Sequence, residues 1–154
     1  MKYKRKAVIC DIDGCLLDTS QIFKEIEEKG LQGNEKWAYF ERYANDRDKA
    51  KFNFILADVL NCLRNQGYKI IFSTARSEAI RINTKIRLQT DLGFMGDLFM
   101  RPLGNINPAA EVKAEHLKRI KEFYNACIAI DDEDENLKMF SKNGLLAVKL
   151  ESRQ

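Results

Sequence analysis

The sequence predicts an α/β fold: a doubly wound, mostly parallel sheet in a single domain spanning residues 1–154, with a small helical cap inserted at residues 19–50. Short runs of apolar and β-branched residues alternate with longer segments of helical periodicity, which is typical of β-α-β crossovers. Gly67, Gly93 and Gly144 each follow a helical segment, where a left-handed C-cap favours glycine. A chain of 154 residues also suffices for one domain with a sizeable core.

Five apolar runs are expected to form the strands, at residues 6–10, 69–73, 97–100, 127–131 and 145–149. Right-handed crossovers between such strands give a parallel sheet, so the carboxyl ends of the strands share one edge. The binding crevice of a doubly wound sheet lies at that edge.

Helical segments are expected between the strands. Two are marked by apolar stripes, formed by Phe54, Val59, Leu60 and Leu63 and by Ile80, Ile86, Leu88 and Leu92. Two more span residues 111–124 and 134–141.

Residues 19–50 interrupt the alternation of strands and helices. The segment is too long for a connecting loop, and its aromatic residues argue against disorder. These residues are Trp37, Tyr39, Phe40 and Tyr43. We therefore expect a small helical cap over the crevice.

The composition is that of an ordinary soluble globular protein, with 45% hydrophobic and 32% charged residues. No apolar run is long enough to span a bilayer or to form a signal-peptide core, so no membrane partner and a cytoplasmic location are expected. The four cysteines show neither C-x-x-C pairing nor the spacing of zinc ligands. The net charge of +3 is too small to indicate nucleic-acid binding by itself.

Two carboxylates follow the first strand. Residues i and i+2 of an extended chain project from the same face, so Asp11 and Asp13 point together while Ile12 turns toward the core. Gly14 allows a sharp bend directly afterwards. One carboxylate can attack an electrophile or hold a metal, and its neighbour can carry the proton. The alternative is a strand that ends in an ordinary acidic turn.

Three further polar clusters follow strand ends: Ser73 to Arg76, Lys113, and the pair Asp131 and Asp132. Each also has a structural explanation. Thr74 could cap a helix, and Lys113 alone would be an ordinary solvated lysine. The single histidine, His116, is expected on the polar surface of its helix.

Taken together and in order, the four clusters resemble the haloacid dehalogenase superfamily of phosphotransferases across the whole chain. Within it, the sequence is similar to the 3′-phosphatase domain of phage-type polynucleotide kinase/phosphatase. The segments that carry this resemblance are residues 67–76, 98–101, 111–115 and 129–132. The resemblance implies a Rossmann-like fold.

The resemblance also implies catalytic roles. Asp11 would be the nucleophile that forms an aspartyl-phosphate, and Asp13 would protonate the leaving group and then deprotonate water. Thr74 and Lys113 would grip the phosphoryl oxygens. Dehalogenase relatives lack an acid/base at the place of Asp13, so this residue favours phosphoryl transfer.

A magnesium ion is implied as cofactor, because it neutralises an anionic phosphate between carboxylates. The resemblance assigns its ligands to Asp11, Asp131, Asp132 and the backbone carbonyl of Asp13. Substrate contacts are assigned to Arg76 and Arg101.

The expected substrate is a phosphorylated nucleotide or a polynucleotide end, most specifically a 3′-phosphate. Three positions depart from the phage domain: Cys15 replaces a threonine, Ala109 replaces an acidic residue, and no arginine stands near Ile22. A small-metabolite phosphatase or a 5′-nucleotidase is therefore the alternative. A non-catalytic nucleotide- or protein-binding module is disfavoured, because such proteins usually lose one of the two aspartates.

Overall fold

A five-stranded parallel sheet forms the centre of the computed structural model, which describes residues 3–151. Its strand order is β5-β4-β1-β6-β7, and every neighbouring pair is parallel. The strands are β1 (Lys6–Cys10), β4 (Lys69–Ser77), β5 (Asp97–Arg101), β6 (Asn125–Asp131) and β7 (Leu146–Lys149). The predicted doubly wound α/β fold is thereby confirmed.

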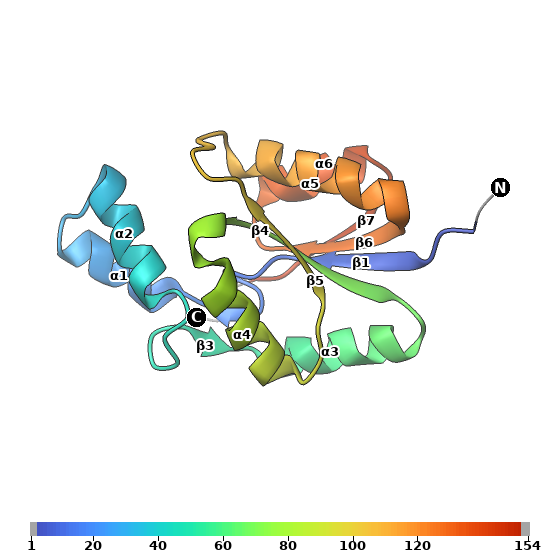
Figure 1. Ribbon diagram of the computed structural model, residues 1–154, viewed down its shortest axis with the longest axis horizontal. Helices are drawn as coiled ribbons and strands as arrows, with labels where there is room; N and C mark the ends of the chain where they lie inside the picture. Colours follow the sequence, from blue (N-terminus) through green and yellow to red (C-terminus); the bar gives the residue numbers. More distant parts are fainter. Residues whose placement is uncertain (1–2, 152–154) are drawn as a thin grey trace.

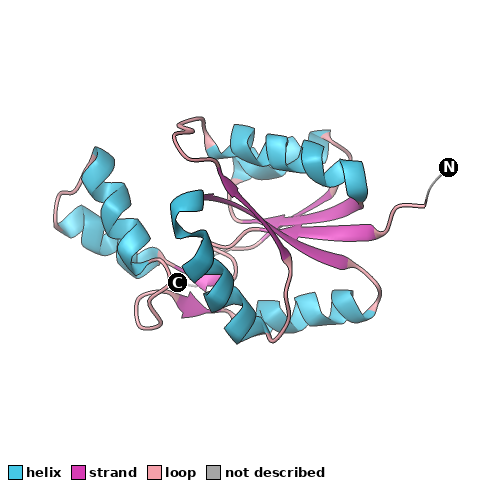
Figure 2. Ribbon diagram, in the orientation of Figure 1, coloured by secondary structure: helices cyan, strands magenta, loops and turns pink. Residues whose placement is uncertain are grey.

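Helices cover both faces of this sheet (Figures 1 and 2). The helices are α3 (Phe54–Asn65) and α4 (Arg81–Leu92) on one face, with α5 (Ala109–Phe123) and α6 (Asp134–Lys142) on the other. A short 3₁₀ turn, η1 (Glu78–Ile80), precedes α4.

The alternation of side chains along β1 explains the two layers. Val8 and Cys10 belong to the hydrophobic cluster that contains the buried residues of α3 and α4. Ala7 and Ile9 belong to the cluster that contains those of α5 and α6. β1 is therefore buried on both sides, as the central strand of a parallel sheet must be.

The apolar stripe predicted for α3 was wrong in part. Phe54 and Val59 are exposed, whereas Leu56, Leu60 and the half-buried Leu63 face the core. The spacing i, i+4, i+7 of the three leucines defines one helix face, which Phe54 and Val59 do not share. In the stripe predicted for α4, Ile86 is likewise exposed.

Residues between β1 and α3 form a separate helical hairpin, which we call the insertion. It consists of α1 (Ser20–Glu28) and α2 (Gly33–Tyr43), which lie beside one end of the sheet (Figure 1). The short strands β2 (Leu17–Asp18) and β3 (Lys51–Phe52) pair antiparallel at its base.

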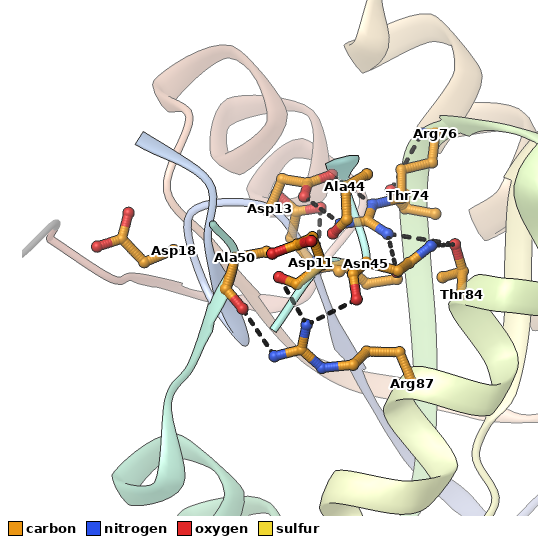
Figure 3. A network of polar contacts seen from close by, with 12 residues as sticks. Asp11, Asp13, Asp18, Ala44, Asn45, Ala50, Thr74, Arg76, Thr84 and Arg87 are labelled. Atoms are coloured by element: carbon orange, nitrogen blue, oxygen red, sulfur yellow. Dashed lines mark hydrogen bonds and ion pairs between the residues drawn. The ribbon is translucent and has the colours of Figure 1, made fainter. Parts of the chain in front are cut away.

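A buried arginine fixes the returning stem of the insertion to α4. Arg87 donates to the backbone carbonyls of Asn45, Asp46 and Ala50, at 3.1, 3.3 and 2.7 Å. Its Nε also donates to Asp91 at 2.6 Å. The insertion is therefore held against the core domain through this stem (Figure 3).

None of the helices within residues 3–151 is long and apolar enough to cross a membrane. The expected cytoplasmic location stays a prediction.

Candidate active site

The predicted site residues meet at the carboxyl edge of the sheet. β4 and β6 flank β1, and the helix before β4 (α3) and the helix before β6 (α5) lie on opposite faces of the sheet, which opens a crevice beside the end of β1. A cleft of about 1020 Å³ lies there. It is lined by Asp11, Asp13, Thr74, Arg76, Arg101, Lys113 and Asp132, and also by residues of α1 and α2.

A buried lysine joins two of the carboxylates. Lys113 Nζ lies 3.0 Å from Asp11 Oδ1 and 2.6 Å from Asp131 Oδ2, and its side chain is 2% exposed. Burial alone would lower the pKa of Lys113, but the Asp11 and Asp131 carboxylates outweigh burial and raise it. Lys113 is therefore a permanent positive charge in the site and not a solvated surface lysine.

The Asp11 carboxylate is positioned by its own backbone and by Lys113. Its Oδ1 accepts a hydrogen bond from the Ile12 backbone N–H at 2.8 Å. Burial raises the pKa of Asp11 well above its ordinary value, and the Lys113 ammonium opposes this shift. The Ile12 N–H and Lys113 both contact Oδ1, so Oδ2 is the oxygen that these two partners leave for reaction.

Asp13 is held by Arg76 through both carboxylate oxygens, at 2.7 and 2.8 Å (Figure 3). Arg76 also donates to the Ala44 carbonyl, to Asn45 Oδ1 and to Thr84 Oγ1. All five guanidinium N–H groups are thus bound to protein acceptors. The Arg76 side chain is fully buried and ties Asp13 to the insertion stem. Its predicted contact with the substrate stays a prediction.

We expect Arg76→Lys to lower the free energy of unfolding by about 3 kcal/mol, because one ammonium cannot replace these separate hydrogen bonds at about 1 kcal/mol each. Urea unfolding measures the change. The control is Arg47→Lys, since the Arg47 side chain is 59% exposed in its pair with Asp91. That variant should change stability by less than about 1 kcal/mol. Equal effects of the two substitutions would contradict the assignment.

Thr74 lies inside β4 and is buried at 1% exposure. Its Oγ1 accepts a hydrogen bond from the Arg76 backbone N–H at 3.1 Å. Because the hydroxyl oxygen serves as the acceptor, its proton stays available for a ligand in the cleft. The alternative role as a helix cap is not observed, since Ser77 caps η1 instead.

Arg101 organises the loop after β5. It donates to the backbone carbonyls of Ala75, Asn105 and Asn107, at 3.0, 3.2 and 2.6 Å. Its predicted contact with the substrate stays a prediction, although the side chain does line the cleft.

The expectation that His116 lies on the surface was wrong. His116 is 4% exposed and lies one turn after Lys113 on the buried face of α5. Its Nε2 lies 2.9 Å from the Met100 carbonyl and its Nδ1 lies 2.8 Å from Ser73 Oγ. Because a carbonyl only accepts, Nε2 carries the proton and Nδ1 accepts from Ser73. The ring is a neutral link between α5, β4 and β5.

We expect this neutral histidine to make the fold sensitive to acid. Burial lowers the pKa of His116 from 6.5 to about 4, so the unfolded chain binds more protons between these values. The contribution of neutral His116 to the free energy of unfolding is fully present above about pH 6.5. About 2–3 kcal/mol of it is lost as the pH falls toward 4. Urea unfolding at pH 7 and pH 4.5 tests this. Between these two pH values, His116→Gln should lose about 2–3 kcal/mol less stability than the wild type. An equal loss in the wild type and in His116→Gln would contradict this role of His116.

A candidate cation site lies beside Asp11. One ligand atom each of Asp11, Cys15 and Asp132 lies within 4.8 Å of the others. Asp132 Oδ1 is buried, and no hydrogen-bond partner for it exists among residues 3–151. Gly14 is required here, because it has φ +81° and a Cβ would overlap the Asp132 carboxylate.

The donor set fits a divalent cation. Burial raises the pKa of Asp132, and the Asp131 carboxylate raises it further, so a cation beside Asp132 would stabilise its charged form. Hard carboxylate oxygens are the ligands that Mg²⁺ prefers. Of the predicted ligands, Asp131 lies outside the cluster. Its oxygens accept hydrogen bonds from Lys113, from the Glu133 N–H and from Asn136.

Sequence reasoning missed the polar residues that support the site. Asn45, Thr84, Arg87 and Asn136 belong to no recognisable motif. A signal existed for two of them: Thr84 and Arg87 share the core-facing side of α4 with Leu88. A charged residue at such a position needs a buried partner.

Comparisons with known proteins agree with this geometry. The family model for the phosphatase domain of polynucleotide kinase PNKP matches residues 5–153. Two solved structures of the Pnkp1/Rnl/Hen1 complex, one described as an RNA repair complex, each contain a chain that is 25% identical, with TM-scores of 0.75 and 0.74. The matches cover 97% and 100% of this chain but only 43% and 48% of those chains, so this chain spans less than half of their length.

A haloacid dehalogenase-like hydrolase, SP0104 from Streptococcus pneumoniae, shares the fold with a TM-score of 0.64 at 13% identity. That match covers 95% of this chain and 84% of SP0104. The search of curated proteins found no match.

Proposed function

This chain belongs to the family of polynucleotide kinase PNKP phosphatase domains within the haloacid dehalogenase superfamily, and we propose that it removes the 3′-phosphate from polynucleotide ends. The family match over residues 5–153 carries this proposal. The arrangement of Asp11, Asp13 and Lys113 around one cleft supports it.

In the proposed reaction, Asp11 Oδ2 attacks the phosphorus atom and displaces the 3′-oxygen of the substrate. Oδ1 is fixed by the Ile12 N–H and by Lys113, and Asp11 lines the cleft, so Oδ2 is assigned as the attacking oxygen. The product of this step is an aspartyl-phosphate. Lys113 and the Thr74 hydroxyl bind the phosphoryl oxygens and offset their charge.

Asp13 carries the proton in both steps. Its side chain is 23% exposed, so it reaches the cleft while Arg76 fixes its orientation. Asp13 protonates the departing 3′-oxygen and then takes a proton from the water that hydrolyses the aspartyl-phosphate. Arg76 is a positioning residue in this scheme.

Asp11 and Asp132 are the residues that would hold Mg²⁺, with the Asp13 backbone carbonyl and Asp131 as further predicted ligands. A bound Mg²⁺ neutralises charge between the carboxylates and the phosphate. The Cys15 thiol lies beside the same oxygens. Burial raises the pKa of Cys15, so it stays protonated as a neutral neighbour.

We also propose that the chain is one domain and that residues 19–50 act as its cap. Side chains of α1 and α2 line the same cleft as the catalytic residues, which supports this role. The stem contacts of Arg76 and Arg87 indicate a fixed cap.

Phosphate release from a substrate panel tests the proposed function. We expect Mg²⁺-dependent release from a 3′-phosphorylated oligonucleotide, with kcat/KM at least about tenfold above that for its 5′-phosphorylated isomer. EDTA should abolish the release. Preference for a 5′-nucleotide or for a small phosphorylated metabolite would instead favour the alternative phosphatases.

A further inference from the structure

The insertion presents an aromatic wall to the active-site cleft. We use this name for Phe23 on α1 and Trp37 on α2, which line the cleft together with Phe40. Phe40 is 5% exposed and supports both rings: its centroid lies 5.2 Å from Phe23 and 6.1 Å from Trp37. Phe23 and Trp37 are 38% and 51% exposed, so the supported rings offer free area to a ligand.

The charges beside the aromatic wall are mainly negative. On the insertion side the cleft is lined by Asp18, Glu27 and Glu41 and by the cation Lys24, and a second cation, Lys36 Nζ, lies 4.9 Å from the centroid of the Trp37 ring. This side therefore disfavours a phosphate group, while neutral planar groups gain from the rings. The positive charge of Lys113 lies at the other side, among the catalytic carboxylates.

The loop after β5 also contributes an exposed apolar side chain to the cleft. Ile106 is 94% exposed and lines the same cleft. Arg101 fixes this loop by donating to the carbonyls of Asn105 and Asn107. The cleft is thus lined by apolar side chains from the insertion and from this loop.

We propose that the aromatic wall is the binding subsite for the base of the terminal nucleotide, with the base stacked on Trp37. This inference rests on the proposed function, because the base belongs to the terminal nucleotide whose 3′-oxygen leaves in that reaction. A purine or pyrimidine is neutral, planar and aromatic, which is the chemistry that the wall can recognise. Stacking on one aromatic side chain is sequence-tolerant and strengthens binding by about tenfold to a hundredfold.

Intrinsic fluorescence tests the contact directly, because Trp37 is the only tryptophan in the sequence. The Asp11→Asn protein avoids turnover during the titration. We expect a nucleoside 3′-monophosphate to quench the emission in a saturable manner, and inorganic phosphate and an abasic ribose phosphate to leave it unchanged. Equal quenching by all three, or by none, would overturn the proposal.

Kinetics provide the second test. For the wild type, kcat/KM for a 3′-phosphorylated oligonucleotide with a normal terminal nucleotide should exceed that for an abasic terminus by about tenfold to a hundredfold. Trp37→Ala should reduce this ratio to near one, and Trp37→Phe should keep most of it. Phe123→Ala is the matched control, since Phe123 is 70% exposed on α5 and does not line the cleft.

The two proposals fail in different ways. An absence of phosphate release from every 3′-phosphorylated substrate by the wild-type protein would contradict the proposed function. Normal phosphate release, with the same ratio of kcat/KM between normal and abasic termini in the wild type and in Trp37→Ala, would overturn the stacking subsite alone. An unchanged circular dichroism spectrum of Trp37→Ala excludes misfolding as the cause of a reduced ratio of kcat/KM between normal and abasic termini.

Discussion

Asp11→Asn is expected to lower the rate of phosphate release by at least about 10⁴-fold while the protein stays folded. An amide oxygen is a poor nucleophile, and no other carboxylate of the cluster has the same position between the Ile12 N–H and Lys113. Burial raises the pKa of Asp11, so a neutral amide at this position removes the cost of a buried charge. Stability should therefore be maintained or increased.

Single-turnover phosphate release and urea unfolding measure the two effects. Asp18→Asn is the matched control, because Asp18 is an exposed carboxylate at the edge of the same cleft. It accepts a hydrogen bond from the Ser20 N–H at 3.0 Å, which an asparagine can also accept. This control should keep its activity within about tenfold of the wild type. An active Asp11→Asn protein would exclude Asp11 as the nucleophile.

Lys113→Met is expected to lower the free energy of unfolding by about 3–5 kcal/mol near neutral pH, and to abolish phosphate release. The substitution leaves the buried carboxylates of Asp11 and Asp131 side by side without their shared cation. Burial already raises the pKa of Asp11, and the variant lacks the Lys113 ammonium that opposes this shift, so the folded variant binds more protons than the unfolded chain. Its lost stability should return as the pH falls and worsen as the pH rises.

Urea unfolding of Lys113→Met and of the wild type at pH 5 and pH 7.5 tests whether the stability deficit of the variant is smaller at the lower pH. Lys118→Met is the control in the same helix, because Lys118 is exposed. It should change stability by less than about 0.5 kcal/mol at either pH. If Lys113→Met had the same pH dependence as this control, Lys113 would not be the cation that neutralises the buried carboxylates.

Most of the fold could be predicted from local patterns in the sequence. A buried strand can be recognised from its own run of apolar residues. The positions of β1 and β6, and with them Asp11 and Asp131, could therefore be predicted. The end of β4 could not, because it continues to Ser77 through the polar residues Thr74 and Arg76. There, hydrogen bonds to distant segments decide the conformation in place of hydrophobicity.

The environment of each side chain was harder to predict than its position in the chain. The resemblance assigned a substrate contact to Arg76, but the sequence could not show that its side chain is held by Asp13 and Asn45, which are remote in sequence. His116 has polar neighbours in sequence and is nevertheless buried, since the face of α5 that carries Lys113 packs on the sheet. Such contacts arise only in the folded chain.

The insertion illustrates the same limit. Its aromatic residues indicated a structured segment, and α1 and α2 are indeed helices. The sequence could not show that Phe40 turns inward while Trp37 stays half exposed in the cleft. That difference separates a hydrophobic core residue from a residue that can bind a ligand.

The most direct test of the central proposal is to trap the phosphoryl group on the protein. A substrate with a radiolabelled 3′-phosphate is mixed with the wild-type protein and Mg²⁺, quenched in acid within one turnover, and the protein is digested for peptide mapping. We predict a label that hydroxylamine removes, confined to the peptide that contains Asp11 and absent from Asp11→Asn. Turnover with no labelled protein, or with the label on another residue, would contradict the account.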